Sequence, residues 1–101
     1  MPPIIASQLD DIRRVCRENG IRRLDLFGSG AKGTFDPARS DLDFYVDLGD
    51  YDRTVGTRYL KVVSFLTRMF GRDIDVVTSR GIRNPAFRTE IEATRTPLYE
   101  A

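Results

Sequence analysis

The chain has 101 residues, a length that suits one domain with a single core, and we expect one domain over residues 1–101. Its 16 Lys and Arg against 15 Asp and Glu give a formal net charge of +1, so no overall field favours nucleic acid or a membrane surface as a partner. One cysteine and no histidine exclude an intrachain disulfide and a zinc site of Cys and His ligands, so that any metal must be held by oxygen.

The first predicted element is a helix near the N-terminus. Met-Pro-Pro-Ile-Ile lacks the basic and apolar segments of a signal peptide, and no apolar run is long enough to cross a membrane, so we expect a cytoplasmic protein. Apolar side chains then recur at steps of four, three and four residues from Ile5 to Cys16, which predicts a helix that ends at Gly20. This pattern makes Cys16 a core residue.

A group of arginines lies on or just after this helix. The simplest interpretation is a solvated basic face rather than a dedicated anion site. Its members are Arg13, Arg14, Arg17, Arg22 and Arg23.

The rest of the chain predicts strands and helices in alternation. Residues 22–27 and 41–48 have the apolar, β-branched and aromatic content of strands. Apolar residues from Val55 predict a long amphipathic helix that ends at Gly71, and a strand follows over residues 72–78. Asn84-Pro85 predicts a helix over residues 85–93, and residues 97–100 suit a short edge strand. This order predicts an α+β fold, a mixed sheet flanked by helices.

The loop between the first two strands contains a glycine pattern. Residues 28–33, GSGAKG, satisfy the Gly-x-Gly-x-x-Gly pattern of dinucleotide-binding folds. Such a fold needs a helix that opens at the last glycine, but Pro37 follows within four residues and ends any helix within about a turn. A Walker phosphate loop is excluded too, because Gly33 rather than Ser or Thr follows Lys32.

The interpretation that survives is an anion-binding turn. Gly28 would let the backbone approach an anion closely, and Ser29 offers a hydroxyl beside outward N–H groups. Taken alone, the same residues favour an ordinary glycine turn.

Four aspartates on two of the predicted strands favour the anion-binding alternative. Asp41 and Asp43 share one face of a strand, roughly 6.6 Å apart, where two ionised carboxylates repel unless cations neutralise them. Asp73 and Asp75 repeat the pattern in a segment whose apolar members, within residues 74–77, look buried. Three carboxylates from two adjacent strands beside a phosphate-shaped turn predict an oxygen site for Mg²⁺ or Mn²⁺ next to a nucleoside triphosphate.

The combination of these motifs resembles a known family. Gly28-Ser29, eleven residues, Asp41-x-Asp43 on a strand and Asp75 on a later strand resemble the nucleotidyltransferase fold of the DNA polymerase beta superfamily. In size the chain is similar to the minimal nucleotidyltransferases, the MNT group. The segments that carry this resemblance are RRLDLFGS, ARSDLDFYV, GRDIDVVT and IRNPAFRTEIEATRTPLYE.

The resemblance implies contacts to the triphosphate from the glycine turn. Gly28 and Ser29 match the motif, and Lys32 stands where the group usually has arginine. The spacer from Ser29 to Asp41 is one residue longer than the commonest form, and Gly30 occupies a position that usually has a side chain. Both departures loosen the loop.

The resemblance also implies the metal ligands and the catalytic carboxylate. Asp41 and Asp43 are implied to bind metal, and Asp75 to be the third carboxylate, which bridges metal and activates the attacking hydroxyl. Asp73 matches no motif position, and we expect it to be dispensable.

The partner implied by the resemblance is another protein. Members of the MNT group are typically encoded beside a HEPN-domain RNase toxin and are similar to antitoxins that transfer AMP from ATP to a tyrosine of that toxin. A chain of this length has no second domain to enclose a small acceptor, which also favours a protein acceptor. Two alternatives stay open: a binding module that neutralises its partner by contact alone, and a nucleotidyltransferase that acts on small molecules.

Overall fold

The computed structural model describes residues 2–28 and 41–101, and its centre is a mixed four-stranded sheet. The strands are β1 (Arg23–Phe27), β2 (Leu42–Asp47), β3 (Ile74–Thr78) and β4 (Thr96–Glu100), in the order β3-β2-β1-β4. β1 pairs antiparallel with both β2 and β4, whereas β2 and β3 are parallel. The parallel pair requires a crossover, which the long helix between β2 and β3 provides.

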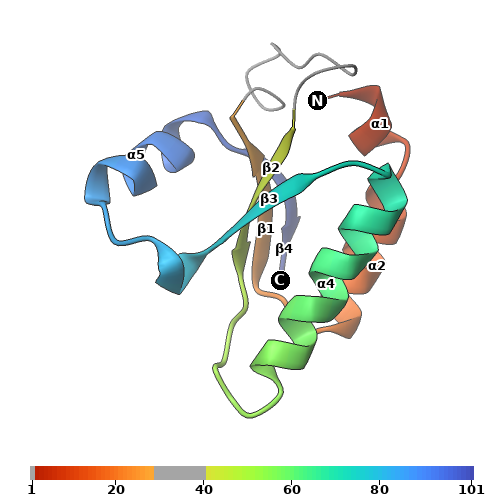
Figure 1. The fold of residues 1–101 in the computed structure, drawn as a ribbon, viewed down its shortest axis with the longest axis horizontal. Helices are drawn as coiled ribbons and strands as arrows, with labels where there is room; N and C mark the ends of the chain where they lie inside the picture. The colour runs from red at the N-terminus through yellow and green to blue at the C-terminus, as the bar shows by residue number, and fades with distance from the viewer. Residues whose placement is uncertain (1, 29–40) are drawn as a thin grey trace.

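Helices cover both faces of the sheet (Figure 1). α1 (Pro3–Ala6), α2 (Leu9–Glu18) and α4 (Val55–Phe70) lie toward one face, with α2 and α4 side by side, while α5 (Pro85–Thr94) lies on the other. A short 3₁₀ turn, η1 (Ser79–Gly81), follows β3. The expected α+β class is confirmed.

Each face of the sheet has its own apolar cluster, because side chains alternate along a strand. The larger cluster packs the sheet against α2 and α4, with Leu24, Leu26 and Phe44 at its centre. The smaller one contains Phe27 and Tyr45 together with Ile91 of α5. The face under α5 is therefore only partly covered, which leaves room for polar side chains there.

The N-terminal helix differs from the sequence prediction. Its apolar face runs as expected, and Cys16 is buried, but the helix is interrupted at Ser7 and Gln8. The Gln8 amide donates to the carbonyl of Ile5, a bond over three residues that closes a tight turn before α2 begins. Gly20 ends this region with a φ of 63°, as its role as a helix stop predicts.

The later elements agree with the predicted ones to within two residues. α4 ends at Gly71, which has a left-handed φ of 58°. Asn84 caps α5, and its side chain accepts a hydrogen bond from the amide of Ala86. β4 is an edge strand, as expected.

One expectation about β3 is wrong. Its apolar residues Ile74, Val76 and Val77 are half-buried rather than buried, and Asp75 is exposed. The reason is the strand order, since β3 forms the edge of the sheet opposite β4.

Among the described helices, none is long and apolar enough to span a membrane.

Candidate active site

Two carboxylates meet across the parallel strand pair. The register places Asp43 of β2 directly beside Asp75 of β3, each one residue after the start of its strand. Paired residues lie on the same face of a sheet, so both side chains occupy the face opposite α2 and α4. The expected adjacency of these two aspartates is confirmed.

Gly28 lies against the first of these carboxylates. Phe27, the last residue of β1, pairs with Asp43, and the chain turns at Gly28 with a φ of 69°. A β-carbon at Gly28 would lie 2.5 Å from Oδ2 of Asp43. Two features therefore require glycine at this position. The backbone is left-handed, and the Asp43 carboxylate occupies the space that a side chain would need.

Asp41 and Asp73 flank the paired carboxylates. Both are exposed, and each stands one residue before its strand, Asp41 before β2 and Asp73 before β3. Asp41 is close enough to Asp43 for its charge to act on that side chain. Ser29 and Lys32, the other residues expected at the site, lie outside the described residues.

The electrostatics of the site favour a cation. Partial burial raises the pKa of Asp43 to about 6, and the neighbouring carboxylates Asp75 and Asp41 contribute in the same direction. A hydrogen bond with Asp75 also favours the protonated form of Asp43. Like charges held this close require either a shared proton or a cation.

The chemistry of the donor set fits a hard divalent cation, because all candidate ligands are carboxylate oxygens. Within residues 2–28 and 41–101, however, no group of three or more acidic, His or Cys side chains is already arranged to hold a metal ion. The described carboxylates need additional oxygen ligands from elsewhere to complete such a site.

Replacing the glycine beside Asp43 should disturb the site more than the fold. We expect Gly28→Ala to displace the Asp43 carboxylate, because the new β-carbon overlaps Oδ2. We also expect a loss of about 1 kcal/mol in the free energy of unfolding from the positive φ. Denaturant titration measures the loss, and ¹³C NMR of the Asp43 carboxyl measures its changed titration. Gly71→Ala, also at positive φ but with open space around it, is the control.

The pKa of Asp43 predicts an effect of pH on the stability of the metal-free protein. The folded pKa is about 6 against an ordinary 3.8, so the folded state binds the proton more tightly. The resulting destabilisation is absent below about pH 4, grows between pH 4 and 6, and is complete above. We therefore expect Asp43→Asn to raise Tm at pH 7.5 and to leave it unchanged at pH 4. Thermal melts in a chelator check this, and an equal gain at both pH values would contradict it.

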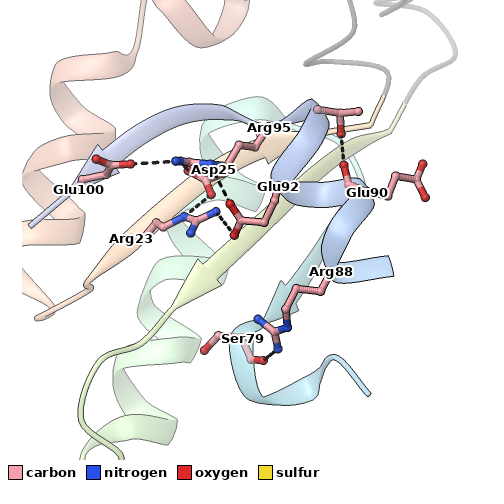
Figure 2. A network of polar contacts seen from close by, with 9 residues as sticks. Arg23, Asp25, Ser79, Arg88, Glu90, Glu92, Arg95 and Glu100 are labelled. Atoms are coloured by element: carbon pink, nitrogen blue, oxygen red, sulfur yellow. Dashed lines mark hydrogen bonds and ion pairs between the residues drawn. The ribbon is translucent and has the colours of Figure 1, made fainter. Parts of the chain in front are cut away.

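A second polar feature on the same face was not anticipated from the sequence (Figure 2). Asp25 of β1 is completely buried, and its carboxylate accepts from Arg23 Nε at 2.5 Å and from Arg95 Nη1 at 3.0 Å. Glu92 of α5 and Glu100 of β4 pair with the outer side of these arginines. We call these five residues the Asp25 network. It joins β1, α5 and β4 on the face of the sheet that α5 covers.

The Asp25 network corrects the interpretation of the N-terminal arginines. Arg23 is not part of a solvated face, because its side chain is only 22% exposed and its guanidinium also stacks 4.8 Å above the ring centre of Tyr45. The other four arginines of that group are exposed. The sequence did contain a signal for this network. In RRLDLF, Asp25 lies among apolar residues and two positions after Arg23, so both lie on the same strand face.

Comparison with known proteins establishes the family. The model of the nucleotidyltransferase domain family matches residues 9–98, and this chain belongs to that family. A protein of Methanocaldococcus jannaschii, provisionally named a protein adenylyltransferase, is 29% identical over 72 residues, 71% of each chain. The chain is thus a nucleotidyltransferase, and the resemblance seen in its sequence is confirmed.

Solved structures with the same fold include minimal nucleotidyltransferases. One protein provisionally named a minimal nucleotidyltransferase has a TM-score of 0.76 and 26% identity, over 92% of this chain and 91% of its own. A toxin–antitoxin structure with AMP-PNP has a TM-score of 0.68 and 23% identity, over 92% and 73% of the chains. The MNT antitoxin in complex with a tri-AMPylated HEPN toxin of Shewanella oneidensis has a TM-score of 0.64 and 18% identity, over 95% and 72%.

Proposed function

We propose that this chain is a Mg²⁺- or Mn²⁺-dependent adenylyltransferase that acts as an antitoxin, transferring AMP from ATP to a tyrosine of a HEPN-type toxin. The observation that carries the proposal is the register pair of Asp43 and Asp75, held beside Gly28 on the open face of the sheet. The family and the M. jannaschii relative support the reaction class. The two toxin–antitoxin structures support AMP transfer and the kind of partner.

The proposed reaction assigns a task to each carboxylate. Asp41 and Asp43 bind a divalent cation. When bound, this cation neutralises negative charge on the triphosphate oxygens. Asp75 takes the proton from the attacking tyrosine hydroxyl. A bond then forms between the tyrosine oxygen and the α-phosphorus, the bond from this phosphorus to the bridging oxygen breaks, and pyrophosphate leaves. Gly28 and Ser29 position the triphosphate, and Lys32 contributes a positive charge to it.

The test uses the purified chain and the HEPN protein encoded beside it. After incubation with ATP and Mg²⁺, intact-mass measurement should show the HEPN protein gaining one or more adenylate groups, with release of pyrophosphate. Peptide mapping should place the groups on tyrosine. An unmodified HEPN protein that is nevertheless held inactive in a stable complex would exclude the enzymatic function and leave neutralisation by binding alone.

The all-carboxylate donor set predicts that metal and nucleotide bind together. Mg²⁺ sites of this kind rely on substrate oxygens to complete six ligands, and no described group of side chains is arranged to hold metal unaided. We expect calorimetry to show weak Mg²⁺ binding, with Kd near 1 mM or above, and at least about tenfold tighter binding with a non-hydrolysable ATP analogue present. Tight binding of Mg²⁺ to the protein without nucleotide would contradict the prediction.

A further inference from the structure

The outward side of α4 carries one of the two large apolar side chains that are exposed among the described residues. The inward side buries Val62, Leu66 and Phe70 against the sheet, as its pattern predicts. The apolar side chain on the outward side is Leu60, which is 62% exposed, and the half-buried Phe65 follows five positions later along the helix. Single exposed apolar residues are common, but here they line a depression.

That depression is a groove between α2 and α4 with a volume of about 450 Å³. Val15 of α2 forms one wall, and Leu60 and Phe65 of α4 form the other. The groove continues past Phe65 and Arg68 into a second hollow of about 440 Å³ beside Met69. Together the two hollows follow α4 over several turns, the shape that a helix from another protein could occupy.

The rim of the groove is basic. α4 contains three basic residues and no acidic one. Arg58 donates to the backbone carbonyls of Asn19 and Leu48, whereas Lys61 and Arg68 form no ion pair among the described residues. These two cations stand seven positions apart with Phe65 between them, so all three lie along one side of the helix.

We propose that this surface, the α4 groove, docks an amphipathic helix of the partner protein that carries acidic residues beside its apolar stripe. Apolar walls with a basic rim are complementary to such a helix in shape and charge. A second copy of α4 is the wrong occupant, because a symmetric pair would set Lys61 and Arg68 against their own copies. The proposal rests on the proposed function only for the identity of the partner.

The position of the groove gives this docking mode a functional consequence. α4 packs on the sheet face that contains Phe44, whereas Asp43 and Asp75 occupy the opposite face. A partner held at the α4 groove therefore leaves the carboxylates open to nucleotide and acceptor. The face covered by α4 would bind the partner, and the opposite face would carry out catalysis. A substitution on one face can then change one property without the other.

Charge reversal on the rim tests the proposal with the HEPN partner. We expect Lys61→Glu/Arg68→Glu to weaken its binding at least about tenfold by calorimetry, without changing Tm. The control, Arg17→Glu/Arg83→Glu, makes the same change of charge at exposed positions outside the α4 groove and should stay within about twofold. Equal losses in both variants, or none in the first, would overturn the proposal.

A designed peptide gives a result that does not depend on the HEPN partner. The probe is a helical peptide with leucines at i, i+3, i+4 and i+7 flanked by glutamates, and its control has lysines in their place. Amide NMR shifts confined to α4 and the end of α2, produced by the glutamate peptide alone, support the docking surface. No shifts there, or equal shifts with both peptides, overturn it. If the HEPN protein fails to bind the unaltered chain while the peptide binds α4, the proposed function fails and the docking surface stands.

Discussion

Asp75→Asn is expected to lower AMP transfer at least about 100-fold while leaving the fold intact. Loss of a general base typically costs a factor of about 10² to 10⁴, and Asn can neither accept the proton nor supply an anionic ligand. Asp75 is exposed on an edge strand, so the replacement removes no buried contact. Single-turnover assays with ATP and the HEPN partner measure the loss, and a Tm that does not fall shows that the loss is not caused by unfolding.

The matched control for this prediction is Asp73→Asn, two positions earlier. Asp73 is also exposed, but it precedes β3 and is not paired with Asp43 in the strand register. We expect transfer to stay within a few-fold of the unaltered protein. If Asp73→Asn abolished transfer while Asp75→Asn spared it, the assignment of the base would be wrong.

The second large effect is expected at a residue with no assigned part in the reaction. Asp25→Asn should reduce the free energy of unfolding by about 3 kcal/mol, because it leaves Arg23 and Arg95 without the buried charge that both contact. For a chain of this size, that loss corresponds to a fall in Tm of more than about 10 °C. Thermal and denaturant unfolding in the presence of chelator measure it without interference from the metal site.

A variant elsewhere in the Asp25 network separates burial from the mere loss of an ion pair. Glu92 pairs with the same two arginines, but its side chain is 45% exposed. Glu92→Gln should therefore cost less than about 1 kcal/mol, as surface pairs generally do. Equal losses for Asp25→Asn and Glu92→Gln would mean that the network contributes through its outer pairs rather than through the buried carboxylate.

The elements that sequence reasoning located well are those specified by local patterns. The 3.6-residue period of α4 and its stop at Gly71 need only neighbouring residues, and Asn84-Pro85 marks the start of α5 in the same way. The site followed a similar logic, since Asp43 and Asp75 each belong to an Asp-x-Asp pattern on a strand. The roles of Asp41, Asp43, Asp75, Gly28, Ser29 and Lys32 remain predictions.

Two of the three features that the sequence did not indicate depend on contacts between distant segments. The break at Ser7 and Gln8 does not change the spacing of the apolar residues on either side of it. The sequence pattern is therefore the same for one continuous helix and for two shorter ones. The burial of Asp25 depends on Arg95, which lies 70 residues away along the chain. The half-burial of β3 follows from its place at the sheet edge, which its own composition does not specify. Long-range pairing decided the burial of Asp25 and the half-burial of β3.

The parallel register of β2 and β3 also limits how this chain can change in length. Because side chains alternate, a slip of β3 by one residue would turn Asp75 to the α4 side of the sheet and bring Ile74 or Val76 beside Asp43. A single residue inserted in the short connection from Phe70 to Ile74 is expected to shift that register and to separate the two carboxylates, with neither aspartate replaced. Insertions in the segment from Gly81 to Asn84 have no such effect on the register. The carboxylate pair is therefore expected to tolerate an added residue after β3 but not one before it.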